Sequence, residues 1–264
     1  MFIDVKPLHN ECQTKSKLLN DMANHTYNWR QMWVSNSMTT SCHECSHAVS
    51  ADLRNDKLVA GEAFGETLWQ PDTNHKKPFT GPNENGFYLF DNKAFKCKEP
   101  KVRKSHAAEY VPNTLRGFRF NTYITGQTAW DDTPLYIFDE WSAYIAGSSC
   151  AIELAEMGDM SPRGTDISSG PVEFLMYSMG LVLAVEKRDK DYFTREPNFL
   201  PFCSYQAARA LKTAEKCNEY FPWDATKKYL DLWNSDTCKA YREILGETPT
   251  PTPKPLNPED FAQA

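Results

Sequence analysis

Residues 43–47 read His-Glu-Cys-Ser-His, with two histidines four positions apart and a glutamate beside the first. Ser and Thr residues at 37–41 offer N-cap candidates, and apolar residues continue at 48–53, so the sequence predicts a helix through this stretch. Side chains four apart lie on one helical face about one turn from each other, so both imidazoles can reach one tetrahedral metal ion. Glu44 is then placed to take a proton from water activated by that ion.

Residues 43–49 resemble the active-site helix of the zincin metallopeptidases, in particular the gluzincin form in which Ala-Val follows the second histidine. The resemblance implies an α+β, zincin-like fold and one Zn²⁺ per chain. It assigns His43 and His47 as zinc ligands and Glu44 as the catalytic base. A zinc site of this kind has a third protein ligand, usually a carboxylate in this branch, and leaves the fourth position to water.

Glu140 is the preferred third ligand. It lies in a segment whose apolar positions recur at helical spacing, which predicts a half-buried helix around it. A carboxylate is seldom placed in such a position without a partner. The pattern Glu140-x-x-Ala143 also resembles the second helix of the gluzincins, where a small residue three positions after the ligand lets two helices approach closely.

Glu66 and Glu62 are the alternatives for this role. Eighteen residues separate Glu66 from the motif, a spacing that resembles the aminopeptidase branch of the gluzincins, and residues 62–66 resemble the E-x-x-A-E ending of other zincins with glycine in the alanine place. Gly61 and Gly65, however, weaken a helix there by roughly 1 kcal/mol each. The local sequence therefore favours Glu140.

A hydrogen-bond donor is needed to stabilise the oxyanion that forms during hydrolysis. Tyrosine commonly has this role in zincins, and Tyr144 lies one turn beyond Glu140 on the same predicted helical face. We take Tyr144 as the first candidate, with Tyr136, Tyr123 and Tyr110 as alternatives.

Charge and hydropathy limit the partners. The chain has 264 residues and a formal net charge of −6, which argues against nucleic acid or an anionic membrane as the main partner. No apolar run approaches the roughly 18 residues of a membrane span. A protein or peptide substrate remains the expected partner.

Eight cysteines are spread along nearly the whole chain. An even number at wide spacing is typical of disulfides in an oxidising compartment, so we expect a secreted or periplasmic protein. The alternative is a structural zinc site built from Cys42, Cys45 and His47, but no second C-x-x-C supplies further ligands.

The chain changes character along its length. Residues 13–52 are predicted to be helical. Residues 61–128 are rich in Gly, Pro and aromatic residues, and alternation predicts strands at 86–90 and 118–123. We expect the edge strand that pairs with an extended substrate to come from the 86–125 region. The basic stretch 98–104 is predicted to be a solvated loop. Further helices are expected near 137–157, 171–188, 204–217 and 225–245. We therefore expect one domain over 1–246 with two lobes around a cleft, and a disordered Pro/Thr-rich tail over 247–264.

The function that these features predict is a zinc metallopeptidase, more specifically an endopeptidase, in which Glu44 assists attack of water on a peptide bond. Two alternatives remain open: a zincin-like binding or scaffold protein with a vestigial or structural metal site, and a zinc amidase acting on cell-wall peptides.

Overall fold

The computed structural model describes residues 1–30, 37–54, 84–162 and 166–246. Within these ranges the chain forms a mainly helical α+β fold with one small antiparallel sheet, as the sequence predicts at that level. The tail beyond 246, Glu62, Glu66 and the other residues of 55–83 lie outside the described residues.

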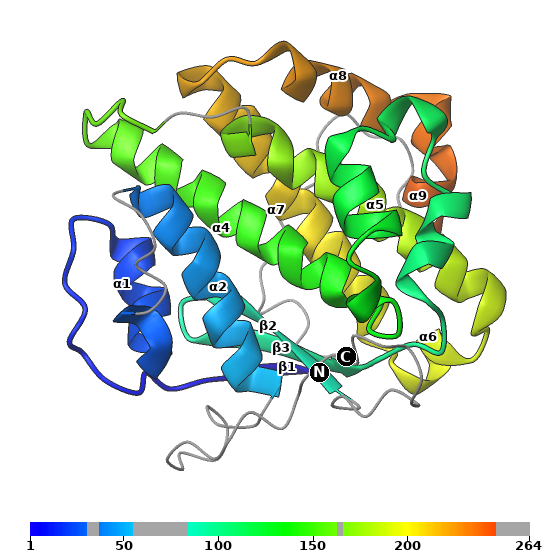
Figure 1. Ribbon diagram of the computed structural model, residues 1–264, viewed down its shortest axis with the longest axis horizontal. Coiled ribbons are helices and arrows are strands. Elements are labelled where there is room, and N and C mark those ends of the chain that lie inside the picture. Colours follow the sequence, from blue (N-terminus) through cyan, green and yellow to red (C-terminus); the bar gives the residue numbers. More distant parts are fainter. Residues whose placement is uncertain (31–36, 55–83, 163–165, 247–264) are drawn as a thin grey trace.

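Helices supply most of the described structure (Figure 1). The α-helices are α1 (Lys17–Asn24), α2 (Met38–Arg54), α4 (Tyr136–Glu156), α5 (Asp166–Arg188), α6 (Tyr192–Arg195), α7 (Phe199–Tyr220), α8 (Asp224–Trp233) and α9 (Lys239–Ile244). Short 3-10 helices occur at Tyr27–Arg30, Lys104–Glu109, Asn113–Leu115, Thr128–Trp130 and Asp236–Cys238, and a π-helix spans Phe120–Thr125.

Three strands form the sheet in the order β1-β3-β2, with both pairs antiparallel. They are β1 (Phe2–Asp4), β2 (Glu84–Phe90) and β3 (Lys93–Lys98). A β-carbon added to Gly86 of β2 would lie only 2.5 Å from the β-carbon of Leu53, so α2 packs directly onto this strand. The strand predicted at 86–90 is therefore confirmed as part of β2, which forms one edge of the described sheet.

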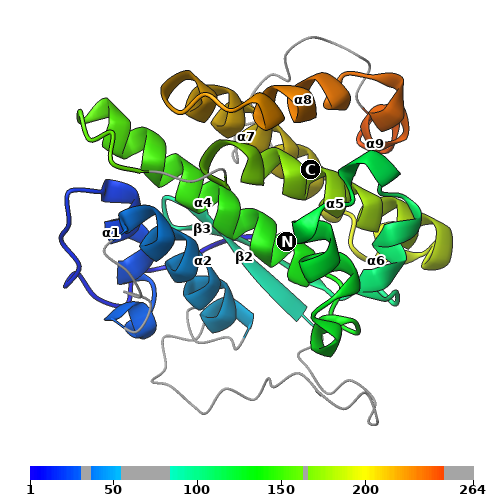
Figure 2. The same cartoon turned by 45° about the horizontal axis from the view of Figure 1, so that its top comes forward.

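Helices α2 and α4 lie side by side, with α1 flanking α2 on its outer side (Figures 1 and 2). Ala143, the small residue expected to permit close packing of the two helices, is fully buried. Gly147, one turn later, also makes a close contact, because a β-carbon there would lie 3.2 Å from the Thr39 carbonyl oxygen and 3.6 Å from the β-carbon of His43. Small residues on α4 thus bring the motif helix close to it.

Two hydrophobic cores meet at α4. The larger core gathers α4, α5, α7 and the sheet, and includes Trp141 and Ile145 of α4. The smaller one joins α1, α2 and the opposite face of α4, where Ala146 and Leu154 pack against apolar residues of α2. Burial on both faces fixes α4 relative to its neighbours and so holds the side chains of its first turns in place.

The longest described helix, α5, is also the only described segment that passes a length and hydropathy test for a membrane span. Of that stretch 94% is buried inside the molecule, as is expected of a core helix. It begins at Asp166, before the predicted start at 171, because Pro171 is tolerated inside it. Proline lacks the N–H that would bond the carbonyl of Ile167, and the thiol of Cys217 donates to that carbonyl instead, at 3.2 Å.

Three predictions about local structure are wrong. Residues 118–123 do not form a strand, because Phe118 is 84% exposed while Phe120 and Ile124 are buried at helical spacing in the π-helix. The basic stretch is not wholly solvated, because Lys104 is fully buried. The helix predicted at 225–245 divides into α8 and α9, since α8 ends at Trp233 and Ser235 caps the 3-10 turn that follows.

The predicted disulfides are also absent. All eight cysteines are buried, free thiols. Packing accounts for several of them, since Cys42, Cys45 and Cys150 belong to the smaller hydrophobic core. The expectation of an oxidising compartment rested on disulfides and therefore loses that support.

Candidate metal centre

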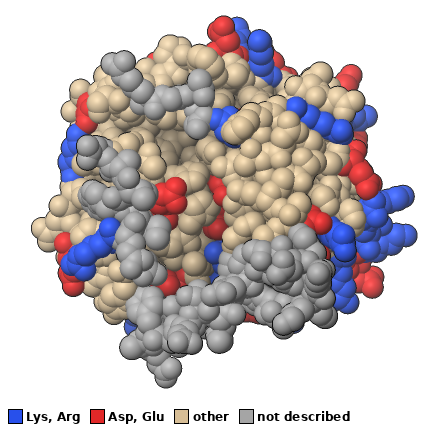
Figure 3. Space-filling view, in the orientation of Figure 1, with Lys and Arg blue, Asp and Glu red and all other residues tan. Residues whose placement is uncertain are grey.

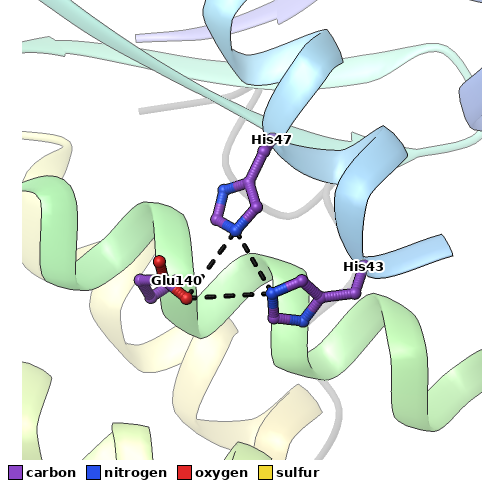
Figure 4. Close-up of side chains that lie close together, drawn as sticks. All are labelled: His43, His47 and Glu140. Carbon is purple, nitrogen blue, oxygen red and sulfur yellow. Dashed lines mark hydrogen bonds and ion pairs between the residues drawn. The ribbon is translucent and has the colours of Figure 1, made fainter. Parts of the chain in front are cut away.

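His43, His47 and Glu140 converge where α2 meets α4 (Figure 4). The two imidazoles project from successive turns of α2, and the carboxylate reaches them from the first turns of α4. The Nε2 atoms of the two histidines are 3.3 Å apart, and the Oε2 atom of Glu140 lies 3.8 Å from that of His43 and 3.6 Å from that of His47. Among the described residues, this is the one group of His, Cys, Asp or Glu side chains that could hold a metal ion.

The spacing of these three atoms fits a tetrahedral ion. Bonds of about 2.0–2.1 Å to nitrogen and oxygen place the ligand atoms of a tetrahedral zinc site about 3.3–3.4 Å from one another. The observed separations of 3.3, 3.6 and 3.8 Å are equal to that value or slightly above it. In addition, the Oε2 atom of Glu140 is buried and has no hydrogen-bond partner. A buried oxygen without a partner is costly, and a cation between the three side chains would satisfy it.

Further contacts orient both imidazoles. The Nδ1 atom of His47 donates to the Oδ2 atom of Asp139 at 3.0 Å, and Arg54 of α2 approaches the same carboxylate oxygen at 3.3 Å. The ring of His43 meets that of Tyr144 edge to face, with centroids 4.8 Å apart. In metal sites a partner such as Asp139 fixes the ring so that its other nitrogen faces the ion. Both Nε2 atoms are therefore directed to one point.

The electrostatics of the two histidines differ. Burial, with the neighbouring His47 adding to it, lowers the pKa of His43 to about 4, so this ring is neutral at pH 7. Burial acts in the same direction on His47, but the charges of Asp139 and Glu140 outweigh it and raise the pKa well above its usual value. The carboxylates thus concentrate negative charge at the point where the nitrogens meet, which favours a cation there.

The carboxylate of Asp139 owes its ionised state to its neighbours. Burial alone raises the pKa of this group, but Arg54 and His47 overcome that effect and lower it to about 2. The motif helix and α4 are consequently joined by a buried chain of charged groups that runs from Arg54 through Asp139 to His47.

The proposed oxyanion donor, Tyr144, lies against the site. Its ring meets the ring of His43 edge to face, with centroids 4.8 Å apart, and stacks on Phe174 at 4.5 Å. Its hydroxyl is 3.5 Å from that of Tyr123, and the guanidinium of Arg119 lies over its ring, 5.7 Å from the centroid. Tyr136 donates to the Oε1 atom of Glu140. Three of the four candidate tyrosines therefore lie around the site, whereas Tyr110 is placed elsewhere, near Tyr241 of α9.

Glu44 follows His43 on α2 and is half-buried. The face of the molecule that carries α2 and α4 is hollowed near its centre, and acidic side chains gather around that hollow (Figure 3). A half-buried carboxylate retains access to water, as a general base must.

Two other sites considered from the sequence receive no support within the described residues. Glu66 and Glu62 cannot be compared with Glu140 because they lie outside those residues. The Cys42, Cys45 and His47 arrangement is not formed, since both thiols point into the smaller hydrophobic core while His47 faces Glu140. Burial raises the pKa of Cys45 to about 12, which keeps this thiol protonated and unsuited to bind a metal ion.

Sequence reasoning missed Asp139 and Arg54. Both are charged residues in segments whose apolar residues recur at helical spacing. Because Asp139 directly precedes Glu140, the sequence does indicate a pair of acidic residues on a half-buried helix. Comparison with protein-family models, with curated proteins and with solved structures found no match to this chain. Function is therefore inferred from the residues of the site.

Proposed function

We propose that the protein is a zinc-dependent metallopeptidase with a zincin-like fold, acting as an endopeptidase on protein or peptide substrates. The observation that carries this proposal is the convergence of His43 and His47 with Glu140. The buried Oε2 atom of Glu140 has no hydrogen-bond partner, and its distances to the two Nε2 atoms are close to those between the ligand atoms of a tetrahedral zinc site. Two imidazole nitrogens and one carboxylate oxygen form a donor set that suits Zn²⁺, with His47 giving up its Nε2 proton on binding, and each chain would hold one ion. When bound, the ion supplies Lewis-acid activation of water and polarisation of a carbonyl group.

The residues of the chain then have distinct roles. Glu44 accepts the proton of the attacking water and returns it to the leaving amine. Asp139 holds His47 in the orientation and tautomer that present Nε2. Tyr144 donates a hydrogen bond to the developing oxyanion.

Zinc content and hydrolysis test the proposal together. Wild-type protein reconstituted with zinc should hold one ion per chain and cleave members of a peptide library. Glu44→Gln should keep the zinc and reduce the rate by about 10²–10⁴-fold, because it removes a general base and leaves the metal ligands intact. Glu156→Gln, an exposed change on α4, is the matched control and should alter neither.

Three outcomes would contradict the proposal in different ways. Wild-type protein that holds no zinc would remove the metal site. Bound zinc without cleavage of any peptide would indicate a binding or scaffold protein. Cleavage of cell-wall peptides alone would indicate an amidase.

A further inference from the structure

The two carboxylate oxygens of Glu140 have different surroundings. The Oε2 atom faces the two histidines, is buried and has no hydrogen-bond partner within the protein. The Oε1 atom instead accepts a hydrogen bond from the hydroxyl of Tyr136. One oxygen is therefore turned towards the histidine nitrogens, and the other is occupied by a phenol.

Tyr136 is itself held in place. It lies one turn before Glu140 on α4, and its backbone N–H donates to the Thr133 carbonyl at 3.0 Å. Its ring stacks on that of Trp130, with centroids 4.5 Å apart and an angle of 14° between the planes. The hydroxyl therefore has little freedom to leave Glu140, and the carboxylate has little freedom to rotate.

This restraint matters because a carboxylate can bind a metal ion through one oxygen or through both. With two histidine nitrogens, a one-oxygen ligand leaves a four-coordinate ion with a place for water, whereas a two-oxygen ligand raises the coordination number. A hydrogen bond from a neighbouring side chain to the second oxygen favours the first arrangement.

We propose that Tyr136 is a positioning residue that makes Glu140 a single-oxygen ligand and so preserves a four-coordinate site. This inference rests on the metal site of the proposed function and assigns no catalytic role to Tyr136. It differs from the expectation that Tyr136 is an alternative oxyanion donor, since its hydroxyl is already committed to Glu140.

Cobalt substitution tests the inference without any need for turnover. Tetrahedral Co²⁺ absorbs visible light more strongly than five- or six-coordinate Co²⁺. In Tyr136→Phe, the visible bands of the Co²⁺ protein should lose intensity as Oε1 becomes free to bind, and zinc affinity in a competition titration should fall about 10–100-fold. Tyr177→Phe is a matched control, because Tyr177 also donates to a glutamate one turn away, Glu173 on α5, at 2.7 Å. It should leave the spectrum and the zinc affinity unchanged.

A second variant keeps the inference testable if Tyr136→Phe does not fold. Trp130→Leu removes the stacking surface and keeps the hydroxyl of Tyr136, so it should weaken the bands and the affinity in the same direction but less. An unchanged Co²⁺ spectrum in both variants would overturn the inference while leaving the metal site intact. Equal losses in Tyr136→Phe and Tyr177→Phe would overturn it as well, since they would reflect general packing. Wild-type protein without affinity for Zn²⁺ or Co²⁺ would instead overturn the proposed function, and the inference with it.

Discussion

The Nδ1 atom of His47 on α2 lies 3.0 Å from the Oδ2 atom of Asp139 on α4, and this contact joins the two helices that carry the metal-binding side chains. Arg54 approaches the same oxygen of Asp139 at 3.3 Å. The aspartate thus orients a ligand of the proposed site and has its own charge balanced from the far end of α2.

Asp139→Asn should lower zinc affinity by about 10–100-fold, because an amide cannot hold the ring of His47 as a carboxylate does. The measurement is a competition titration with a zinc chelator. Asp21→Asn is the control, since Asp21 also lies beside a histidine, His25, but in α1. Unchanged zinc affinity in Asp139→Asn would show that the contact supports the fold alone.

Tyr144→Phe should reduce kcat by about 10²–10³-fold and leave zinc content unchanged, if its hydroxyl stabilises the oxyanion. Tyr123→Phe should have a smaller effect, because Tyr123 contacts the hydroxyl of Tyr144 and would act through it. Steady-state kinetics with one peptide substrate separates the two. The reverse ranking would assign the oxyanion role to Tyr123.

The local part of the site was predictable because it depends on one helical turn. The spacing of His43 and His47 requires only helix geometry, and the apolar residues around Glu140 predicted the helix that presents it. The role of Asp139 was harder to foresee, because adjacent helical residues point in different directions. Asp139 and Glu140 nevertheless reach the same ring, since they approach the two different nitrogens of His47.

Long-range packing explains what the sequence did not predict. Phe118 and Phe120 alternate with charged and polar residues as in a strand, yet the backbone there ends in a π-helix whose last carbonyls accept hydrogen bonds from Lys104. Nothing in the basic run 98–104 marks one lysine as buried. The cysteines likewise follow a disulfide pattern in number and spacing, although each is accommodated as a small buried side chain.

The thiols should be unreactive in the folded protein, because all eight are buried and burial raises the pKa of Cys45, Cys217 and Cys238 to about 12 in each case. Titration with a thiol reagent without reductant should detect almost none in native protein and all eight in concentrated guanidinium. Fewer than eight in the denatured protein would reveal disulfides and contradict the structure. Rapid reaction in native protein would mean that at least one of these thiols is accessible and would contradict their burial.

Lys104 supports the π-helix that carries Tyr123. Its fully buried ammonium donates to the carbonyls of Tyr123, Ile124 and Gly126. Lys104→Met removes these bonds and leaves the carbonyls buried, so the free energy of unfolding at pH 7 should fall by about 2–4 kcal/mol. Denaturant unfolding followed by circular dichroism measures this change, and Lys101→Met, an exposed change in the same basic stretch, should have little effect.

The difference in free energy of unfolding between wild type and Lys104→Met should grow as the pH rises. Burial lowers the pKa of Lys104 from 10.5 to about 8, so between these values the unfolded chain binds more protons than the folded one. Stability from this group therefore rises as the pH rises through that window, and no change from it is expected below pH 7. The gap between wild type and Lys104→Met should widen by about 1–3 kcal/mol from pH 7.5 to pH 10. A constant or narrowing gap would show that the lysine keeps an ordinary pKa and that its buried bonds cost little to maintain.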